Sequence, residues 1–323
     1  MSPRPTASPV VAVFDAHPDS YLPLVESVVP PNRLRVCRDP GRLSEVAADA
    51  EVLLAFKFSP QPFPRDAVLS LDRLAWVQLA SAGSDHMLPF DPTRLTVTNA
   101  SGIHGDTMAE YVVGTLVHMT WDFPRLLRQQ QEHRWEKYEV PSLARLTMGI
   151  IGAGHVGQRI GHRARAFGMR VIGTRRGAGA VDGFDETRGP DGLQSVLGES
   201  DIVVLTLPLT AETQRMFGSR ELRWINPGAW LVNVSRGGIV QEDALLQVLR
   251  EKRLSGAILD VFAEEPLSKD SPFWDLPNVL VTPHISSEFA GWPGAVARLF
   301  LKNLERWTRN APLLNVVDPA LGY

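Results

Sequence analysis

Three ionisable residues in the C-terminal half of the chain each follow a short apolar run. They are Arg236, Glu265 and His284. An arginine can bind a substrate carboxylate and polarise the neighbouring carbonyl group, and a histidine can donate a proton while a hydride arrives. A carboxylate beside the histidine favours the imidazolium form and holds the ring. Together these side chains predict the chemistry of 2-keto acid reduction.

Each of these residues also has an ordinary structural interpretation. Arg236 could be a surface residue at the start of a helix. Glu265 could be a solvated acid next to Glu264, and His284 a loop histidine with its hydrogen bonds satisfied. The catalytic interpretation gains weight because all three lie downstream of a dinucleotide-binding motif.

That motif, Gly152-Ala-Gly154-His-Val-Gly157, has the G-x-G-x-x-G spacing. An apolar run at 148–151 precedes it and a helical pattern at 156–167 follows it, which is the context that the motif requires. Gly152 permits a tight turn, Gly154 lets a pyrophosphate approach the backbone, and Gly157 lets the helix pack closely on the strand. The N–H groups at the helix start can then bind phosphate.

The residue that distinguishes NAD(H) from NADP(H) is expected about 20 residues further on, at the end of the next strand. That strand, 170–173, runs into Thr174-Arg175-Arg176, with no acid to accept from the ribose hydroxyls. Two guanidinium groups suit a 2′-phosphate. We therefore predict NADP(H) as the preferred cofactor, with NAD(H) possible. The alternative is two solvated arginines in an NAD(H) enzyme.

The elements that position these residues follow a pattern of strands alternating with helices, which predicts parallel βαβ units. In the first hundred residues a helix is expected at 44–49, and the expected strands are 10–14, 33–37, 52–56, 76–79 and 96–99. The expected strands of a second unit are 148–151, 170–173, 202–206, 229–234, 256–259 and 279–282. The predicted fold class is α/β, with two Rossmann-like doubly wound parallel-sheet domains.

Between the two sets of strands, 106–118 has the apolar spacing of a long helix, with Asp106 and Thr107 as its expected caps. The charged, aromatic-containing segment 121–142 is either a solvated helix and loop or a dimer-forming arm. A last helix is expected at 292–307.

Composition sets further limits. The chain has 323 residues, of which 44% are apolar and 21% charged, as is typical of a globular protein. A formal charge of -3 without long runs of one sign argues against a nucleic-acid or membrane-surface partner. The single cysteine, Cys37, cannot form an internal disulfide or a cysteine-based zinc site, and no metal is expected. No apolar stretch suggests a signal peptide or a membrane span, so we expect a cytoplasmic protein.

Over nearly its whole length the sequence resembles the D-isomer-specific 2-hydroxyacid dehydrogenases, and most of all their glyoxylate/hydroxypyruvate reductase branch. The resemblance rests on four segments in order: the glycine motif, Asn233-Val-Ser-Arg-Gly237, Asp260-Val-Phe-Ala-Glu-Glu-Pro266 and Thr282-Pro-His284. It implies an NAD(P)-dependent oxidoreductase that reduces a small 2-keto acid to the D-2-hydroxy acid.

The resemblance also implies roles for single residues. Arg236, Glu265 and His284 match the family's catalytic residues, and Arg236 and His284 also contact the substrate. Asp260 matches the acid that binds the nicotinamide carboxamide. The substrate loops would include Ala82, Gly83 and Lys57. The other implied cofactor positions are Gly152, Gly154, His155, Val156, Gly157, Thr174, Arg175, Arg176, Leu207, Pro208, Thr213, Val234, Ser235, Ser286 and Thr107.

At the level of domains, the resemblance implies a discontinuous, flavodoxin-like substrate-binding domain made of 1–103 and 289–323. Residues 104–288 would form the dinucleotide-binding Rossmann domain. Members of the family are usually homodimers, with the crossing helix and the arm after it at the interface. Trp135 would then reach the partner's active site and Trp292 would narrow the pocket, or both could be plain packing residues.

Two alternatives stay open. One is an NAD(H)-preferring dehydrogenase for a bulkier 2-hydroxy acid, because loop shape rather than motif decides which side chain fits. The other is a nicotinamide-sensing binding protein related to corepressors, which could retain all three catalytic residues. A formate dehydrogenase is disfavoured, because those enzymes carry glutamine where Glu265 stands.

Overall fold

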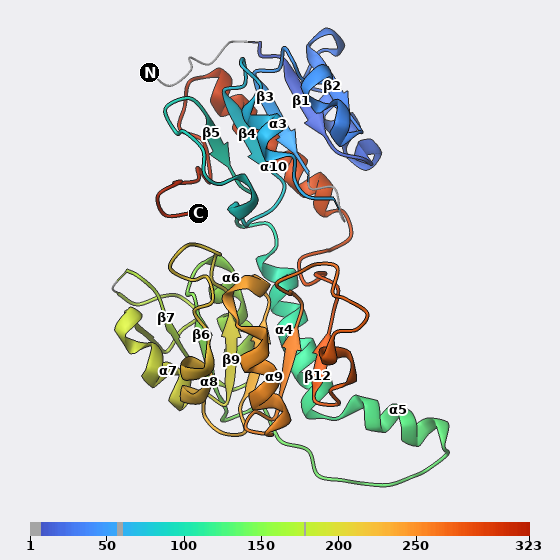
Figure 1. The fold of residues 1–323 in the computed structure, drawn as a ribbon, viewed down its shortest axis with the longest axis vertical. Coiled ribbons are helices and arrows are strands. Elements are labelled where there is room, and N and C mark those ends of the chain that lie inside the picture. Colours follow the sequence, from blue (N-terminus) through green and yellow to red (C-terminus); the bar gives the residue numbers. More distant parts are fainter. Residues whose placement is uncertain (1–7, 57–60, 178) are drawn as a thin grey trace. The chain divides into compact units, whose positions relative to one another are not determined.

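A computed structural model describes residues 8–56, 61–177 and 179–323 (Figure 1). The chain divides into two compact units. Unit 1 is made of Met1–His104 and Phe289–Tyr323, and unit 2 is Gly105–Glu288. Unit 1 is therefore built from two separate stretches of the chain.

Unit 1 contains a parallel sheet with the strand order β2-β1-β3-β4-β5. This is the order of flavodoxin-like sheets. Its strands are β1 (Val11–Phe14), β2 (Leu34–Cys37), β3 (Val52–Ala55), β4 (Trp76–Leu79) and β5 (Thr96–Thr98). Each lies within one residue of the apolar run that predicted it, so the five predicted strands are confirmed.

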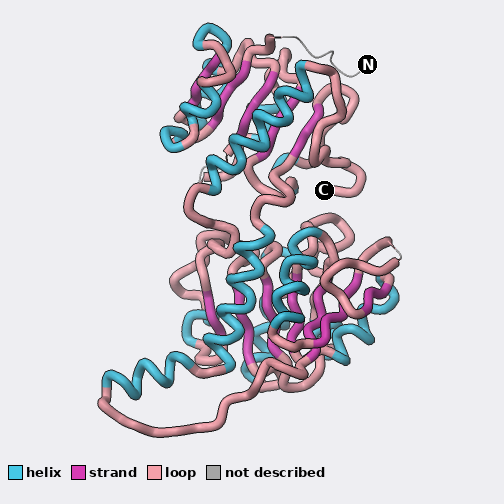
Figure 2. Tube along the Cα trace, turned by 180° about the vertical axis from the view of Figure 1, so that it is seen from behind, coloured by secondary structure: helices cyan, strands magenta, loops and turns pink. Residues whose placement is uncertain are grey.

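Helices cover both faces of this sheet (Figure 2). On one face lie α1 (Leu22–Glu26) and α10 (Trp292–Thr308), and on the other lie α2 (Leu43–Val46) and α3 (Arg65–Leu69). The predicted helix at 44–49 is shorter than expected, because the chain leaves it at Ala47 and turns into β3. The predicted helix at 292–307 is confirmed as α10.

Unit 2 contains a second parallel sheet, with the strand order β12-β11-β10-β9-β6-β7-β8. This extends the Rossmann order 3-2-1-4-5-6 by one strand. Its strands are β6 (Thr147–Ile151), β7 (Arg170–Thr174), β8 (Glu186–Arg188), β9 (Ile202–Leu205), β10 (Trp230–Asn233), β11 (Gly256–Leu259) and β12 (Val279–Val281).

Six of these strands confirm the prediction, and β8 was missed. Its three residues, Glu-Thr-Arg, contain no apolar side chain, so the hydrophobic pattern gave no signal. The strand lies at the edge of the sheet and pairs only with β7. Charged side chains are usual on such an edge, where one side of the strand meets solvent.

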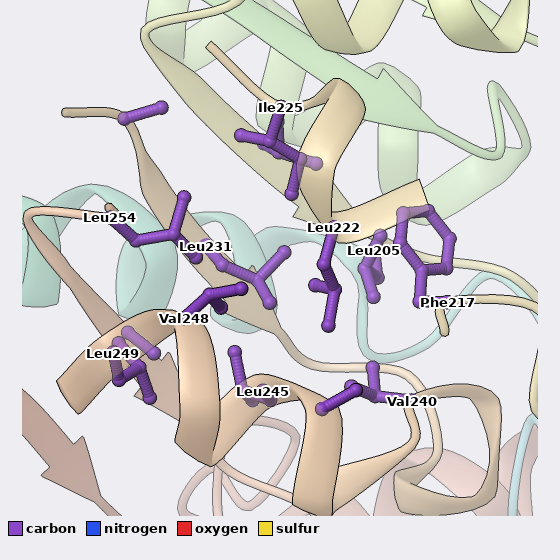
Figure 3. Close-up of a cluster of buried hydrophobic side chains, with 14 of the residues drawn as sticks. Leu205, Phe217, Leu222, Ile225, Leu231, Val240, Leu245, Val248, Leu249 and Leu254 are labelled. Carbon is purple, nitrogen blue, oxygen red and sulfur yellow. The ribbon is translucent and has the colours of Figure 1, made fainter. Parts of the chain in front are cut away.

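Two apolar cores flank the sheet of unit 2. Helices α4 (Gly105–Thr120) and α6 (His155–Ala166) pack on one face. The other face is covered by α7 (Leu193–Glu199), α8 (Ser219–Trp224) and α9 (Glu242–Arg250). Figure 3 shows this second core, where Leu205 and Leu231 meet helical side chains such as Leu245. Because both faces are covered, the strands are continuous apolar runs.

The long helix α4 starts one residue earlier than predicted. Asp106 and Thr107 therefore lie in its first turn, and the prediction that they cap it is wrong. Asp106 accepts a hydrogen bond from Arg163 of α6, and its charge is favourable at a helix N-terminus. After α4 comes α5 (Phe123–Gln131), which with the following loop projects away from the rest of unit 2 (Figure 1).

Among the described residues, no helix is long and apolar enough to cross a membrane. The cytoplasmic location stays a prediction. In the same part of the chain, no cluster of three or more histidine, cysteine or acidic side chains could hold a metal ion.

Candidate active site

The C-terminal ends of three neighbouring strands, β10, β11 and β12, carry the residues with catalytic potential. Arg236 follows β10, Glu265 lies in the turn after β11, and His284 follows β12. Since these strands are parallel and adjacent, their carboxyl ends meet at one edge of the sheet of unit 2. The sequence separates these residues by up to 48 positions (284 − 236), and the sheet gathers their turns.

His284 and Glu265 form a direct pair. Nδ1 of His284 lies 2.8 Å from Oε2 of Glu265, and both side chains are about one third exposed, at 37% and 31%. A carboxylate accepts only, so Nδ1 carries the proton and Nε2 is the nitrogen left to exchange a proton with a substrate. The other carboxylate oxygen, Oε1, accepts from the backbone N–H of Phe262, which fixes Glu265 in its turn.

Asp260 holds the turn that carries His284. Its side chain is fully buried, and Oδ1 accepts from the Thr282 hydroxyl at 2.6 Å and from the Ile285 N–H at 2.9 Å. Oδ2 accepts from the Ser286 N–H at 2.9 Å, and the Asp260 carbonyl accepts from the His284 N–H. These bonds keep His284 at a positive φ of 54°, which is uncommon for a residue other than glycine.

Tyr111 of α4 extends this network. Its hydroxyl lies 2.6 Å from the Thr282 hydroxyl. Thr282 uses its only proton toward Asp260, so the tyrosine is the donor. Burial raises the pKa of Tyr111 above its usual range, which keeps the hydroxyl protonated. The sequence gave no signal for Tyr111 beyond its place on the apolar face of a helix.

The turn that carries Arg236 packs closely against the turn that carries Glu265. A Cβ atom on Gly237 would lie 1.8 Å from the backbone of Phe262, so only glycine allows this approach. Asn233 braces the first turn, because Oδ1 accepts from the Ser235 backbone and hydroxyl while Nδ2 donates to the Arg236 carbonyl. The Arg236 guanidinium donates to the Ser235 carbonyl.

The glycine motif has the geometry of a phosphate cradle. Gly152 has a φ of 111°, and a Cβ atom on Gly157 would lie 2.3 Å from the Gly152 carbonyl oxygen. These two positions therefore require glycine for the fold. A Cβ atom on Gly154 would meet nothing within 4 Å and would stand in open space at the N-terminus of α6. The open position lies where a pyrophosphate would approach the helix, so the residues fit a dinucleotide.

The far end of the cradle carries the two arginines that follow β7. Arg175 and Arg176 are exposed, whereas Thr174 is buried at the end of the strand. Nη2 of Arg176 lies 2.5 Å from Oε2 of Glu212, a residue that the sequence analysis did not single out. Glu212 lies in the loop after β9, beside the predicted residues Leu207, Pro208 and Thr213.

This loop after β9 is closed by its own hydrogen bonds. The Thr213 hydroxyl donates to the Pro208 carbonyl at 2.6 Å and accepts from the Thr210 N–H. At its start, the Thr206 hydroxyl donates to the Gly152 carbonyl at 2.7 Å, which ties the loop to the glycine motif. Thr206 was predicted only as a strand residue; a polar side chain directly after an apolar strand was the available signal.

The other predicted cofactor residues lie at the same edge of unit 2. His155 and Val156 form the first turn of α6, and the start of α4, where Thr107 lies, packs on His155 because a Cβ on Gly105 would touch its ring. Three further residues are buried in the turns after β10 and β12: Val234, Ser235 and Ser286.

The predicted substrate loops belong to unit 1, so the structure does not place them in one unit with the catalytic residues. The Ala82 carbonyl accepts from Asn99, and the Gly83 carbonyl accepts from the Ser81 hydroxyl. Lys57 lies outside the described residues. The ring of Trp292 packs against Phe56 at 5.4 Å, whereas Trp135 of unit 2 is 92% exposed.

Known proteins resemble the chain in both sequence and fold. Residues 113–286 match the family model "D-isomer specific 2-hydroxyacid dehydrogenase, NAD binding domain". A glycerate dehydrogenase of Methylorubrum extorquens is 31% identical over 292 residues, which cover 86% of this chain and 89% of that protein.

Two solved structures extend the similarity to the fold. A D-isomer specific 2-hydroxyacid dehydrogenase family protein of Aeromonas salmonicida has a TM-score of 0.85 and 32% identity, and the match covers 97% of this chain and 99% of that one. An NADPH-dependent glyoxylate/hydroxypyruvate reductase of Sinorhizobium meliloti, solved with NADP and sulfate, has a TM-score of 0.83 and 27% identity, with coverage of 97% and 99%.

Proposed function

The chain belongs to the D-isomer specific 2-hydroxyacid dehydrogenase family, and we propose that it reduces a small 2-keto acid of the glyoxylate or hydroxypyruvate type to the D-2-hydroxy acid. NADPH is the proposed hydride donor. The hydrogen-bonded pair of His284 and Glu265 carries the proposal, because it is a positioned proton donor beside a dinucleotide cradle. The Sinorhizobium reductase, with its printed activity, supports the choice of substrate class.

The nicotinamide cofactor supplies the hydride when bound. Gly152, Gly154 and the N–H groups at the start of α6 would hold its pyrophosphate. Unit 2 is thus the proposed dinucleotide-binding domain, with 104–288 as its expected bounds. Unit 1, with 1–103 and 289–323, is the proposed substrate domain, and Ala82 and Gly83 would present backbone N–H groups to the substrate carboxylate.

The chain's own residues divide the remaining work. Arg236 binds the substrate carboxylate and polarises the keto oxygen with its fixed positive charge. His284 gives a proton from Nε2 to that oxygen as it gains negative charge. Glu265 accepts at Nδ1, orients the ring and stabilises the imidazolium that the reaction requires.

The preference for NADPH rests on the two arginines after β7. A 2′-phosphate would find guanidinium groups at Arg175 and Arg176, and no carboxylate stands at the end of this strand to accept from ribose hydroxyls. The pair of Arg176 with Glu212 is the observation that favours NAD(H) as a second cofactor, because it removes part of the positive charge.

We also propose a homodimer, with α5 and the loop after it at the interface. Four large apolar side chains there are exposed in the single chain: Trp121, Phe123, Leu126 and Leu127. Monomers rarely expose a contiguous apolar patch without a partner. Trp135 on the same arm would then extend toward the partner. Sedimentation of the purified protein tests this, and a monomer at micromolar concentration would contradict it.

The first experiment is the loss of cofactor absorbance with glyoxylate, hydroxypyruvate, pyruvate and phenylpyruvate, each with NADPH and with NADH. The proposal expects the highest kcat/KM for a small acid with NADPH. Highest kcat/KM for phenylpyruvate with NADH would instead support a dehydrogenase for bulkier acids. Binding of cofactor without turnover of any acid would favour a nicotinamide-sensing protein.

A further inference from the structure

Arg176 and Glu212 join two loops that are 36 positions apart in the sequence. Arg176 follows β7, and Glu212 lies in the loop after β9. Nη2 of the arginine and Oε2 of the glutamate are 2.5 Å apart. The neighbouring Arg175 has no acidic partner among the described residues. The two adjacent guanidinium groups therefore differ: one is neutralised by a carboxylate and the other is not.

The pair stands at the place where a cofactor 2′-phosphate would arrive. The end of the strand after the glycine motif is where dinucleotide-binding folds contact the adenosine ribose. The loop that carries Glu212 is tied to the glycine motif through the Thr206 hydroxyl. A phosphate bound by Arg175 and Arg176 would therefore meet the Glu212 carboxylate as a negatively charged neighbour.

We propose that Glu212 is a specificity-determining residue, which holds back the preference for NADPH over NADH by neutralising Arg176 when no 2′-phosphate is bound. This rests on the proposed function. To bind Arg176, the 2′-phosphate has to displace the carboxylate, whereas a cofactor with a 2′-hydroxyl leaves the pair intact. The chain thereby keeps NADH as a usable cofactor despite two arginines at the selecting position.

The ion pair is built so that it can open. The Glu212 side chain is 75% exposed and that of Arg176 40%, and exposed pairs of this kind contribute little to stability. Glu212 also lines a polar cavity of about 730 Å³, together with Arg215 and Arg220, so its side chain has room to turn away from Arg176. Opening the pair needs no rearrangement of the apolar core.

Calorimetric titration of the full-length protein with 2′,5′-ADP and with 5′-ADP tests the proposal without turnover. Glu212→Gln should bind 2′,5′-ADP about three- to tenfold more tightly, the range expected for removing one exposed charge near a phosphate at moderate salt. Binding of 5′-ADP should be unchanged. The gain should shrink at high salt, because the added attraction is screened.

Two further variants make the test specific. Glu305→Gln removes the same charge from an exposed arginine pair in unit 1 and should leave both affinities unchanged. In an Arg176→Gln background, Glu212→Gln should give a clearly smaller gain, because its charge no longer acts through Arg176.

The outcomes separate the two proposals. Equal tightening of both nucleotides in Glu212→Gln, or no tightening of either, would overturn the role of Glu212. So would a full gain in the Arg176→Gln background. If the unmodified protein binds neither nucleotide nor NADPH, the proposed function itself fails.

Discussion

His284 Nδ1 and Glu265 Oε2 lie 2.8 Å apart, although the two residues come from turns after different strands. The contact fixes the ring by one nitrogen and leaves the other for the substrate. Asp260 holds the backbone of His284 through four hydrogen bonds to its turn and carbonyl. The site thus separates two tasks: Glu265 orients the imidazole, and Asp260 places the turn that carries it.

Replacing the histidine tests the proton donor. In His284→Ala, turnover should fall roughly 10²–10⁴-fold, the usual contribution of a positioned acid. NADPH binding, measured by calorimetry, should stay nearly the same, because the glycine cradle is untouched. Turnover close to that of the unmodified enzyme would remove His284 from the mechanism.

Replacing the glutamate tests the charge next to the ring. Glu265→Gln keeps the size and a hydrogen-bond acceptor, but it no longer stabilises the imidazolium. The rate of 2-keto acid reduction should therefore start to fall at a lower pH, which a pH profile of kcat/KM measures. The adjacent Glu264→Gln serves as the control and should leave the profile in place. A uniform loss without a shift would leave Glu265 only the role of orienting the ring.

Reversing the charge at Arg175 tests the cofactor assignment. Arg175→Asp should raise the KM for NADPH far more than the KM for NADH, because the new carboxylate repels a 2′-phosphate and can accept from a 2′-hydroxyl. Steady-state kinetics with both cofactors decide this. Equal effects on both KM values would contradict a phosphate site at Arg175.

The glycine motif offers a matched pair of variants. Gly157→Ala places a Cβ atom 2.3 Å from the Gly152 carbonyl, so we expect unfolding free energy to drop by about 1–3 kcal/mol and cofactor binding to weaken. Gly154→Ala meets no protein atom within 4 Å and should fold normally while weakening cofactor binding. Denaturant titration and calorimetry separate the two effects. Tight NADPH binding by Gly154→Ala would contradict the cradle.

Removing the Tyr111 hydroxyl tests the network behind His284. Tyr111→Phe deprives Thr282 of its donor in a largely buried place, which should cost about 1 kcal/mol of unfolding free energy. Turnover should fall several-fold, with the KM for NADPH unchanged, because only the turn of His284 loosens. Tyr138→Phe, whose hydroxyl donates to an exposed backbone carbonyl, is the control and should change neither quantity. Full activity in Tyr111→Phe would restrict the tyrosine to a packing role.

Local patterns in the sequence predicted the strands, because each parallel strand is an apolar run covered on both faces. β8 escaped prediction since its Glu186-Thr-Arg188 segment lies at a solvent-facing edge and carries no apolar side chain. The glycine motif could be interpreted in advance for a similar reason: a turn with a φ of 111° and a contact of 2.3 Å are demands that glycine alone meets.

The sequence by itself therefore determined the α/β class, the order of the elements and the kinds of residue that end each strand. Only the tertiary structure decided which of those residues touch. Glu265 meets His284, Tyr111 meets Thr282, and Glu212 meets Arg176, each across more than 15 positions of sequence. Such contacts depend on which strands become neighbours in a sheet, and that order follows from packing of the whole unit rather than from any local run of residues.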